Sequence, residues 1–206
     1  MKKSRISEVL SGLIDLIVAG LLWILCSLPV ITIGASSTAL YYAVVKCVRH
    51  NRGRLTPTFF FGFRSNVRQA SLIWLLFLAY LLVGLADAYA IGRMGFGPNS
   101  ILHHISRLFF LLPLLLFPWV FAFISRFQNT VGGTLKFCGW LALRYPGKTL
   151  VLTLELIGFL LISWLMPPII PILPGILCLL LSITIEPLFK TLHSDDDRAP
   201  DPWYNE

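Results

Sequence analysis

The chain has 206 residues, of which 56% are hydrophobic and 13% are charged, and its formal net charge is +7. A soluble globular domain carries about 25% charged residues, so something other than water must solvate much of this protein's surface. The composition excludes a disordered chain, a coiled coil, a collagen-like fibre and a disulfide scaffold. It indicates an integral membrane protein, in which the four cysteines, without CxxC spacing, are small apolar side chains.

Four long stretches contain no Asp, Glu, Lys or Arg. They cover residues 16–45, 69–86, 108–125 and 156–185. A charged side chain at the bilayer centre costs about 2.5–3.5 kcal/mol on insertion scales, so such stretches indicate membrane spans of about 20 residues. The first and last stretches are too long for one span. Prolines interrupt both, within 28–34 and within 166–175, so each is predicted to be a helical hairpin.

The predicted fold class is therefore all-α: a polytopic transmembrane helical bundle in a single domain, residues 1–206. Six membrane helices are expected at Val9–Leu28, Ser36–Val48, Ala70–Gly92, Ser100–Ser125, Thr149–Met166 and Pro171–Phe189. The second of these is short. It either spans the membrane fully, re-enters it from one side, or is tucked against its neighbours.

The basic residues predict the orientation. If both termini are cytoplasmic, every Lys and Arg except Arg93 and Arg107 falls on the cytoplasmic side, as the positive-inside rule requires. The cytoplasmic parts are then the N-terminus (1–8), two amphipathic connections (49–69 and 126–148) and a polar tail (190–206). This distribution explains the positive net charge without nucleic acid as a partner, because no basic soluble domain is present.

Both connections are predicted to be interfacial helices on the cytoplasmic side. In the first, Arg64 and Arg68 share one helix face and Phe60, Phe63 and Val67 share another. In the second, an apolar stripe lies on a different face from a row of larger side chains at i, i+4 spacing. The stripe is Val131, Leu135, Cys138 and Ala142, and the row is Lys136, Trp140 and Arg144. The cations expected to contact anionic lipid headgroups or a partner protein are Arg64, Arg68, Arg126, Lys136, Arg144 and Lys148.

Catalytic signals are weak. Residues 142–149 fit a relaxed P-loop pattern, but an amphipathic segment precedes them and a membrane helix follows, where the motif needs a strand and a soluble helix. Adjacent His103 and His104 would point about 100° apart on a helix, so they do not chelate one ion together. No serine or cysteine lies in a nucleophile motif. We predict no enzyme activity, no cofactor and no metal site.

Four ionisable residues at membrane depth are better leads, because such residues are costly in lipid unless they are paired or functional. They are Asp87, Arg107, Glu155 and Glu186. Asp87, Arg107 and Glu186 are expected near the interfaces, with a pairing of Asp87 and Arg107 as an alternative. Glu155 is expected to face a partner helix, a polar cavity or the basic inner surface.

These segments together resemble the YesL-like family, small bacterial integral membrane proteins long classed as of unknown function. The resemblance is carried by residues 28–34 (LPVITIG) and 39–42 (ALYY), with softer matches at 60–69 and 125–130 and at the break ending in Gly175. Its motif positions here are Leu28, Pro29, Thr32, Gly34, Tyr41 and Tyr42.

Members of that family typically lie beside genes for carbohydrate importers of the ATP-binding-cassette (ABC) type. The resemblance therefore implies an accessory subunit in the bacterial cytoplasmic membrane that contacts lipid and the permease subunits of such an importer. It implies no catalytic residues. The alternatives are an autonomous small transporter or channel, or a membrane sensor or assembly factor.

Overall fold

The computed structural model describes residues 5–93, 101–127 and 129–193. Over these ranges the chain is helical, without a β-strand, which confirms the all-α prediction there. The α-helices are α1 (Arg5–Ser27), α2 (Ile33–Ala43), α3 (Leu55–Arg93), α4 (Ile101–Arg126), α5 (Val131–Arg144), α6 (Pro146–Leu165) and α7 (Leu173–His193). Short 3-10 helices lie at Val30–Thr32 and Pro167–Ile169, and a π-helix follows α2 at Val44–Arg49.

Four helical segments are long and apolar enough to cross a membrane, which supports the prediction of a membrane protein. They are Val30–Arg49, Leu55–Arg93, Pro146–Leu165 and Leu173–Thr191. Two shorter apolar helical segments, Ser11–Ser27 and Leu112–Ile124, coincide with the first and fourth expected spans. The total of six spans remains a prediction.

The two proline-containing breaks lie where the sequence predicts them. Helix α1 ends at Ser27, and the Thr32 hydroxyl donates hydrogen bonds to the carbonyls of Cys26 (2.6 Å) and Pro29 (2.7 Å), which closes the first turn. Helix α6 ends at Leu165, before the consecutive prolines that begin the second turn. Because proline lacks an N–H and restricts the residue before it, both long apolar stretches fold back as hairpins.

The first predicted interfacial helix and the third predicted span form one continuous helix. Helix α3 has 39 residues, a length of about 58 Å, whereas the hydrocarbon core of a bilayer is about 30 Å thick. Pro57 lies in its first turn, where a missing N–H costs nothing. No helix-breaking residue follows between Arg68 and Ala70, so the boundary expected at residue 69 is not a break in the chain.

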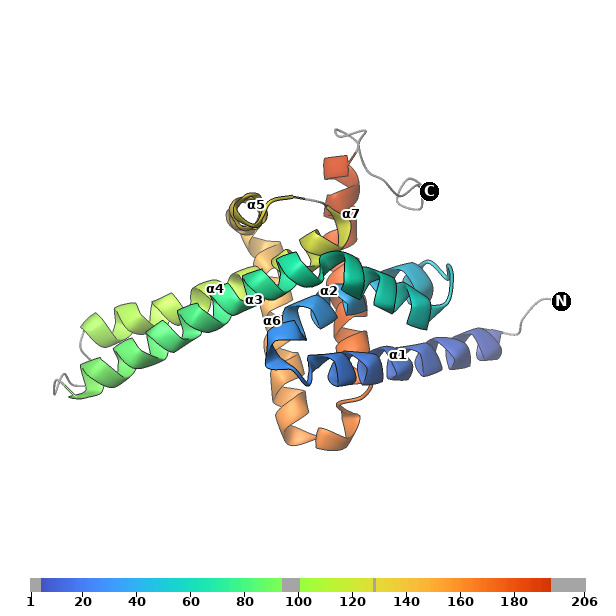
Figure 1. Cartoon of the computed structure of the whole chain (residues 1–206), viewed down its shortest axis with the longest axis horizontal. Coiled ribbons are helices and arrows are strands. Elements are labelled where there is room, and N and C mark those ends of the chain that lie inside the picture. The colour runs from blue at the N-terminus through green and yellow to red at the C-terminus, as the bar shows by residue number, and fades with distance from the viewer. Residues whose placement is uncertain (1–4, 94–100, 128, 194–206) are drawn as a thin grey trace.

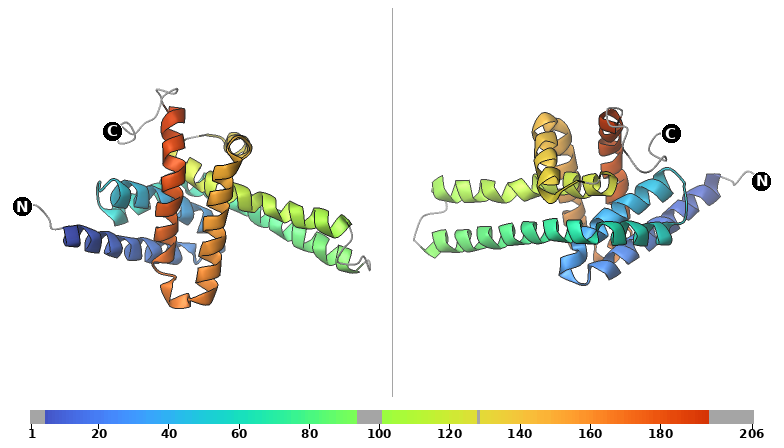
Figure 2. Two further views of the ribbon diagram at one scale, coloured as in Figure 1. Left: turned by 180° about the vertical axis from the view of Figure 1, so that it is seen from behind. Right: turned by 45° about the horizontal axis from the view of Figure 1, so that its top comes forward.

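The α3–α4 hairpin and the α6–α7 hairpin cross, so the helices are not one bundle of parallel spans. Helices α3 and α4 lie side by side and reach away from the rest of the molecule, while α6 and α7 run across them (Figure 1, Figure 2). Helix α2 lies in the centre and packs on α1, α3, α4 and α7. Of the segment Val30–Arg49, 67% is buried, against 22% for the windows in α3 and α6. Other helices therefore cover most of the second expected span.

The start of α2 is pressed directly against α3 and α4. A Cβ atom added to Gly34 would collide with the carbonyl oxygen of Ala70 and lie 2.7 Å from Cβ of Trp74 and 2.9 Å from Cε1 of Phe121. The indole Nε1 of Trp74 donates to the carbonyl of Val30 at 2.7 Å. Small residues allow helix backbones to approach closely, which explains why glycine occupies this motif position.

Candidate functional site

A buried ion pair and a tyrosine hydroxyl join three helices. Arg126 is the last residue of α4, Glu186 lies on α7, and Tyr41 lies on α2. Arg126 donates from Nη2 to Oε2 of Glu186 at 2.6 Å and from Nε to Oε1 at 3.1 Å. The hydroxyl of Tyr41 donates to the same Oε1 at 3.1 Å. The paired arginine–carboxylate bonds fix both distance and orientation, so this junction has a defined geometry.

The burial of this pair corrects the expectation for Arg126. Glu186 is 4% exposed and Arg126 is 9% exposed, so neither lies at the surface. The expected position of Glu186 near a membrane interface stays a prediction. Arg126 was expected among the cations that contact lipid headgroups or a partner protein, and it pairs with Glu186 instead. The physical reason is mutual neutralisation: α4 ends against α7, and each charge compensates the other where water is excluded.

A second polar contact lies one turn earlier on α7. Arg49, at the end of the π-helix, donates from Nη1 to the hydroxyl of Ser182 at 2.8 Å. Lys46 Nζ donates to the Tyr42 hydroxyl at 3.2 Å. Burial lowers the pKa of the neighbouring His50, against the opposing effect of the Glu186 carboxylate. π-helical turns often mark functional positions, and this one brings cations toward the polar face of α7.

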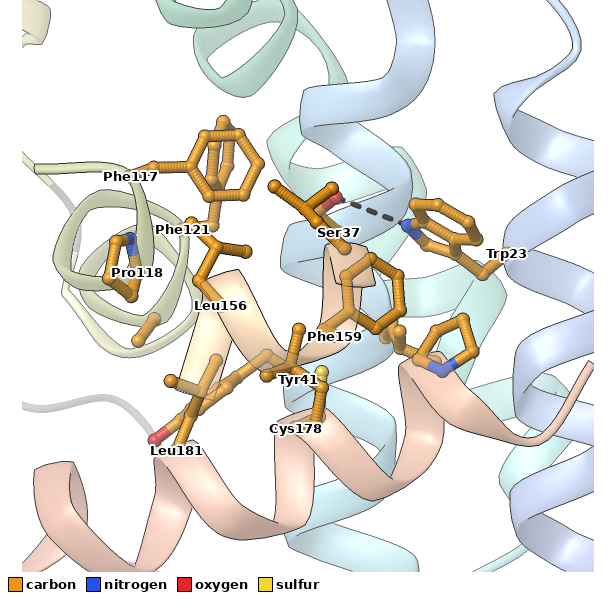
Figure 3. Close-up of a pocket in the computed structure, with 15 residues that line it drawn as sticks. Trp23, Ser37, Tyr41, Phe117, Pro118, Phe121, Leu156, Phe159, Cys178 and Leu181 are labelled. Carbon is orange, nitrogen blue, oxygen red and sulfur yellow. Dashed lines mark hydrogen bonds between the residues drawn. The ribbon is translucent and has the colours of Figure 1, made fainter. Parts of the chain in front are cut away.

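An apolar cavity of about 210 Å³ lies beside Tyr41 (Figure 3). Five helices contribute its walls. The lining residues are Trp23, Ser37, Leu40, Tyr41, Phe117, Pro118, Phe121, Ala122, Leu156, Phe159, Leu160, Pro174, Leu177, Cys178 and Leu181. Tyr41 belongs to both features, because its ring lines the cavity while its hydroxyl bonds Glu186. The cavity and the ion pair therefore form one candidate site.

The other predicted basic residues lie on α3, on α5 and at the start of α6. Arg64 and Arg68 are exposed on α3, and Lys136 and Arg144 are exposed on α5. Lys148 is half-buried at the start of α6, with Nζ 5.7 Å from the ring centre of Tyr145. The two amphipathic segments are joined by a hydrogen bond from Gln69 Nε2 to Thr134 Oγ1, at 3.0 Å. They form neighbouring parts of one surface, which the sequence did not indicate.

The remaining predicted residues are dispersed. Asp87 is exposed on α3, and the side chain of Arg107, its expected alternative partner, lies outside the described residues. Glu155 is half-buried on α6, and its Oε2 is buried without a hydrogen-bond partner in the described part of the chain. Of the motif positions, Leu28 and Pro29 are exposed and Thr32 is half-buried, whereas Gly34, Tyr41 and Tyr42 are buried.

The ion pair of Arg126 and Glu186 provides charge pairing, and the cavity provides apolar contact. Over the described residues, no group of three or more His, Cys, Asp or Glu side chains is placed to hold a metal ion. Burial raises the pKa of the Cys138 thiol on α5 to about 12, which keeps it protonated and unreactive at neutral pH. The ion pair and the cavity are suited to helix packing and to binding.

Sequence reasoning missed the ion pair, although a signal for it exists. Arg126 directly follows the uncharged stretch 108–125, and Glu186 directly follows the uncharged stretch 156–185. In the predicted topology both stretches end on the same side of the membrane. Opposite charges at the same ends of two spans are a reasonable indication of a pair. Placing Tyr41 beside them requires the tertiary structure.

Comparison with known families covers part of this site. Residues 16–88 match the model of an uncharacterised family, described as "Protein of unknown function, DUF624". The matched segment runs from α1 through most of α3, so it includes Gly34 and Tyr41 but not Arg126 or Glu186. No curated protein and no solved structure matches the chain. The match supports a relationship to that family and does not indicate an activity, because the family's function is unknown.

Proposed function

We propose that this protein is an accessory subunit in a bacterial cytoplasmic membrane that binds the permease subunits of an ABC-type carbohydrate importer. The importer as partner comes from the resemblance to YesL-like proteins. Binding through helices, rather than through a soluble domain, is supported by the structure's apolar surface. In this proposal the ion pair at Arg126 and Glu186 is the internal support of the subunit.

The observation that carries the proposal is the exposed outer part of α3. Leu82, Val83, Leu85 and Tyr89 are all exposed, on a hairpin that reaches away from the other helices (Figure 1). Such a surface is covered by lipid, by another membrane protein, or by both in turn. Helix packing in membranes depends on close van der Waals fit, and a projecting hairpin offers a neighbour more accessible surface than a helix within a compact bundle.

The proposed topology has six spans with both termini in the cytoplasm. The first part of α3 and all of α5 then lie at the cytoplasmic interface, where Arg64, Arg68, Lys136 and Arg144 are exposed. Each basic residue near an acidic leaflet gains about 1 kcal/mol, so these residues orient the protein whether or not they also contact a partner.

The test is recovery of importer permeases with the tagged full-length chain after mild extraction from native membranes. Val83→Trp adds bulk on the outer part of α3, and Leu150→Trp is the matched control at an exposed position of α6. We expect permeases to be recovered with the parent chain and the control, and severalfold less with Val83→Trp. Recovery of the parent chain alone would contradict the proposal.

A further inference from the structure

The cavity beside Tyr41 has the size and the surface of a hydrocarbon site. At about 210 Å³ it is larger than the apolar cavities of about 150 Å³ that bind benzene. Aromatic side chains from four helices form much of its wall, among them Trp23, Phe121 and Phe159 (Figure 3). A short run of methylene groups fits this space.

The polar atoms around the cavity are already engaged within the protein. Trp23 donates from Nε1 to the hydroxyl of Ser37 at 3.1 Å, and that hydroxyl donates to the carbonyl of Ile33 at 2.8 Å. The Tyr41 hydroxyl is directed to Glu186. A polar ligand would give up its hydrogen bonds to water and gain few here, which disfavours its binding. The cavity therefore selects an apolar ligand.

The rim of the cavity indicates where that ligand comes from. Leu160 lines the cavity and is 52% exposed, on a helix that is long and apolar enough to cross a membrane. Ile157 and Leu161, beside it on α6, are exposed too. In a bilayer this face of α6 is surrounded by acyl chains, so a chain that enters past Leu160 stays in an apolar medium throughout.

We propose that the cavity binds an acyl chain of a membrane lipid. A bound chain contacts the Tyr41 ring and adds packing between α2, α4, α6 and α7, next to the junction that the ion pair holds. The proposal depends on placement in a membrane but not on any protein partner. Failure to bind an importer would leave it standing, and the experiment below uses the purified chain in the absence of other proteins.

The experiment is photo-crosslinking in lipid nanodiscs. The full-length chain is reconstituted with phosphatidylglycerol and phosphatidylethanolamine, including a phospholipid that carries a diazirine at the middle of one acyl chain, and labelled peptides are mapped after irradiation. We expect labelling of the buried lining residues Pro118, Phe121 and Ala122 on α4 to exceed, severalfold, labelling of the exposed segment 82–85 of α3. Equal or weaker labelling at the cavity would overturn the proposal.

Two variants test whether the label enters the cavity. Ala122→Phe fills the cavity from α4, and Leu160→Trp adds bulk at an exposed position of its lining. We expect either variant to reduce cavity labelling severalfold while labelling of α3 stays constant. If Ala122→Phe does not fold, Leu160→Trp decides the outcome alone. Unchanged cavity labelling in the folded variants would count against the proposal.

Tyr41→Phe is the matched control, because it keeps the ring that lines the cavity and removes only the hydroxyl that bonds Glu186. We expect cavity labelling to persist in this variant. Its loss would show that the polar junction, rather than the apolar cavity, determines binding, and the proposal would then be wrong.

Discussion

Helix α2 and the outer part of α3 are both apolar, but they lie in opposite environments. Most of Val30–Arg49 is buried within the protein, whereas most of the apolar window of α3 is not. The buried helix is rich in small residues and in hydroxyls, while the exposed part of α3 carries large aliphatic side chains such as Leu82 and Val83. Side-chain size and polarity, more than hydropathy, separate a helix that faces protein from one that faces its surroundings.

The first prediction concerns the polar junction at the end of α2. Glu186→Ala leaves the Arg126 guanidinium buried without its carboxylate, and we expect a loss of about 3–5 kcal/mol in unfolding free energy, measured by denaturant titration in micelles. Lys190→Ala, at an exposed position one turn further along α7, is the control and should change stability little. Equal losses in the two variants would show that the pair has no special role.

A double variant sharpens this test. Replacing both charges, with Arg126→Met and Glu186→Leu together, removes the unpaired charge and keeps most of the volume. We expect it to recover most of the stability that Glu186→Ala loses. A double variant as unstable as the single one would assign the loss to packing rather than to charge.

The second prediction compares two positions on one helix. Ile73 on α3 is fully buried, and Leu82 on the same helix is exposed. Ile73→Ala should cost about 2–5 kcal/mol, because it leaves a cavity in the packed core. Leu82→Ala should stay within about 0.5 kcal/mol of the parent. Similar losses at the two positions, in the same denaturant titration, would remove the distinction between the two regions.

The third prediction, with the smallest effect, uses two glycines. Gly34→Ala places a methyl group against the backbone of α3, and we expect it to cost about 1–3 kcal/mol. Gly158→Ala on α6 meets nothing within 4 Å and should stabilise the protein by about 0.5–1 kcal/mol. Thermal unfolding of the pair should show shifts of opposite sign. A shift of the same sign in both would contradict the close approach of α2 and α3.

Local chemistry made part of this architecture predictable. The turns at Pro29 and at the consecutive Pro167 and Pro168 follow from the sequence, as does the helical class. Proline alone does not decide where a helix ends, because Pro113 and Pro118 lie inside α4 and Pro187 lies inside α7. The continuity of α3 past residue 69 was less visible, because the change from amphipathic to apolar pattern there is a change of surroundings and not of backbone. The crossing of the two hairpins depends on contacts between distant segments, which no single stretch of sequence encodes.

Some residues of the candidate site were also predictable from the sequence, and others were not. The exposed cations Arg64, Arg68, Lys136 and Arg144 were recognisable from helical spacing. The role of Arg126 was assigned wrongly, because sequence alone does not distinguish a cation at the headgroups from one that pairs with a distant carboxylate. Tyr41 is a motif position of the family resemblance, and only the structure places it between the ion pair and the cavity.

In the function that we propose, the projecting α3–α4 hairpin binds another membrane protein. The most direct measurement is site-specific photo-crosslinking in native membranes, with a photoreactive amino acid at Val83 or Leu85 on α3, and at Val44, which is fully buried, as the control. We expect adducts with an importer permease from the α3 positions and not from Val44. Adducts with lipid alone at both α3 positions would contradict it.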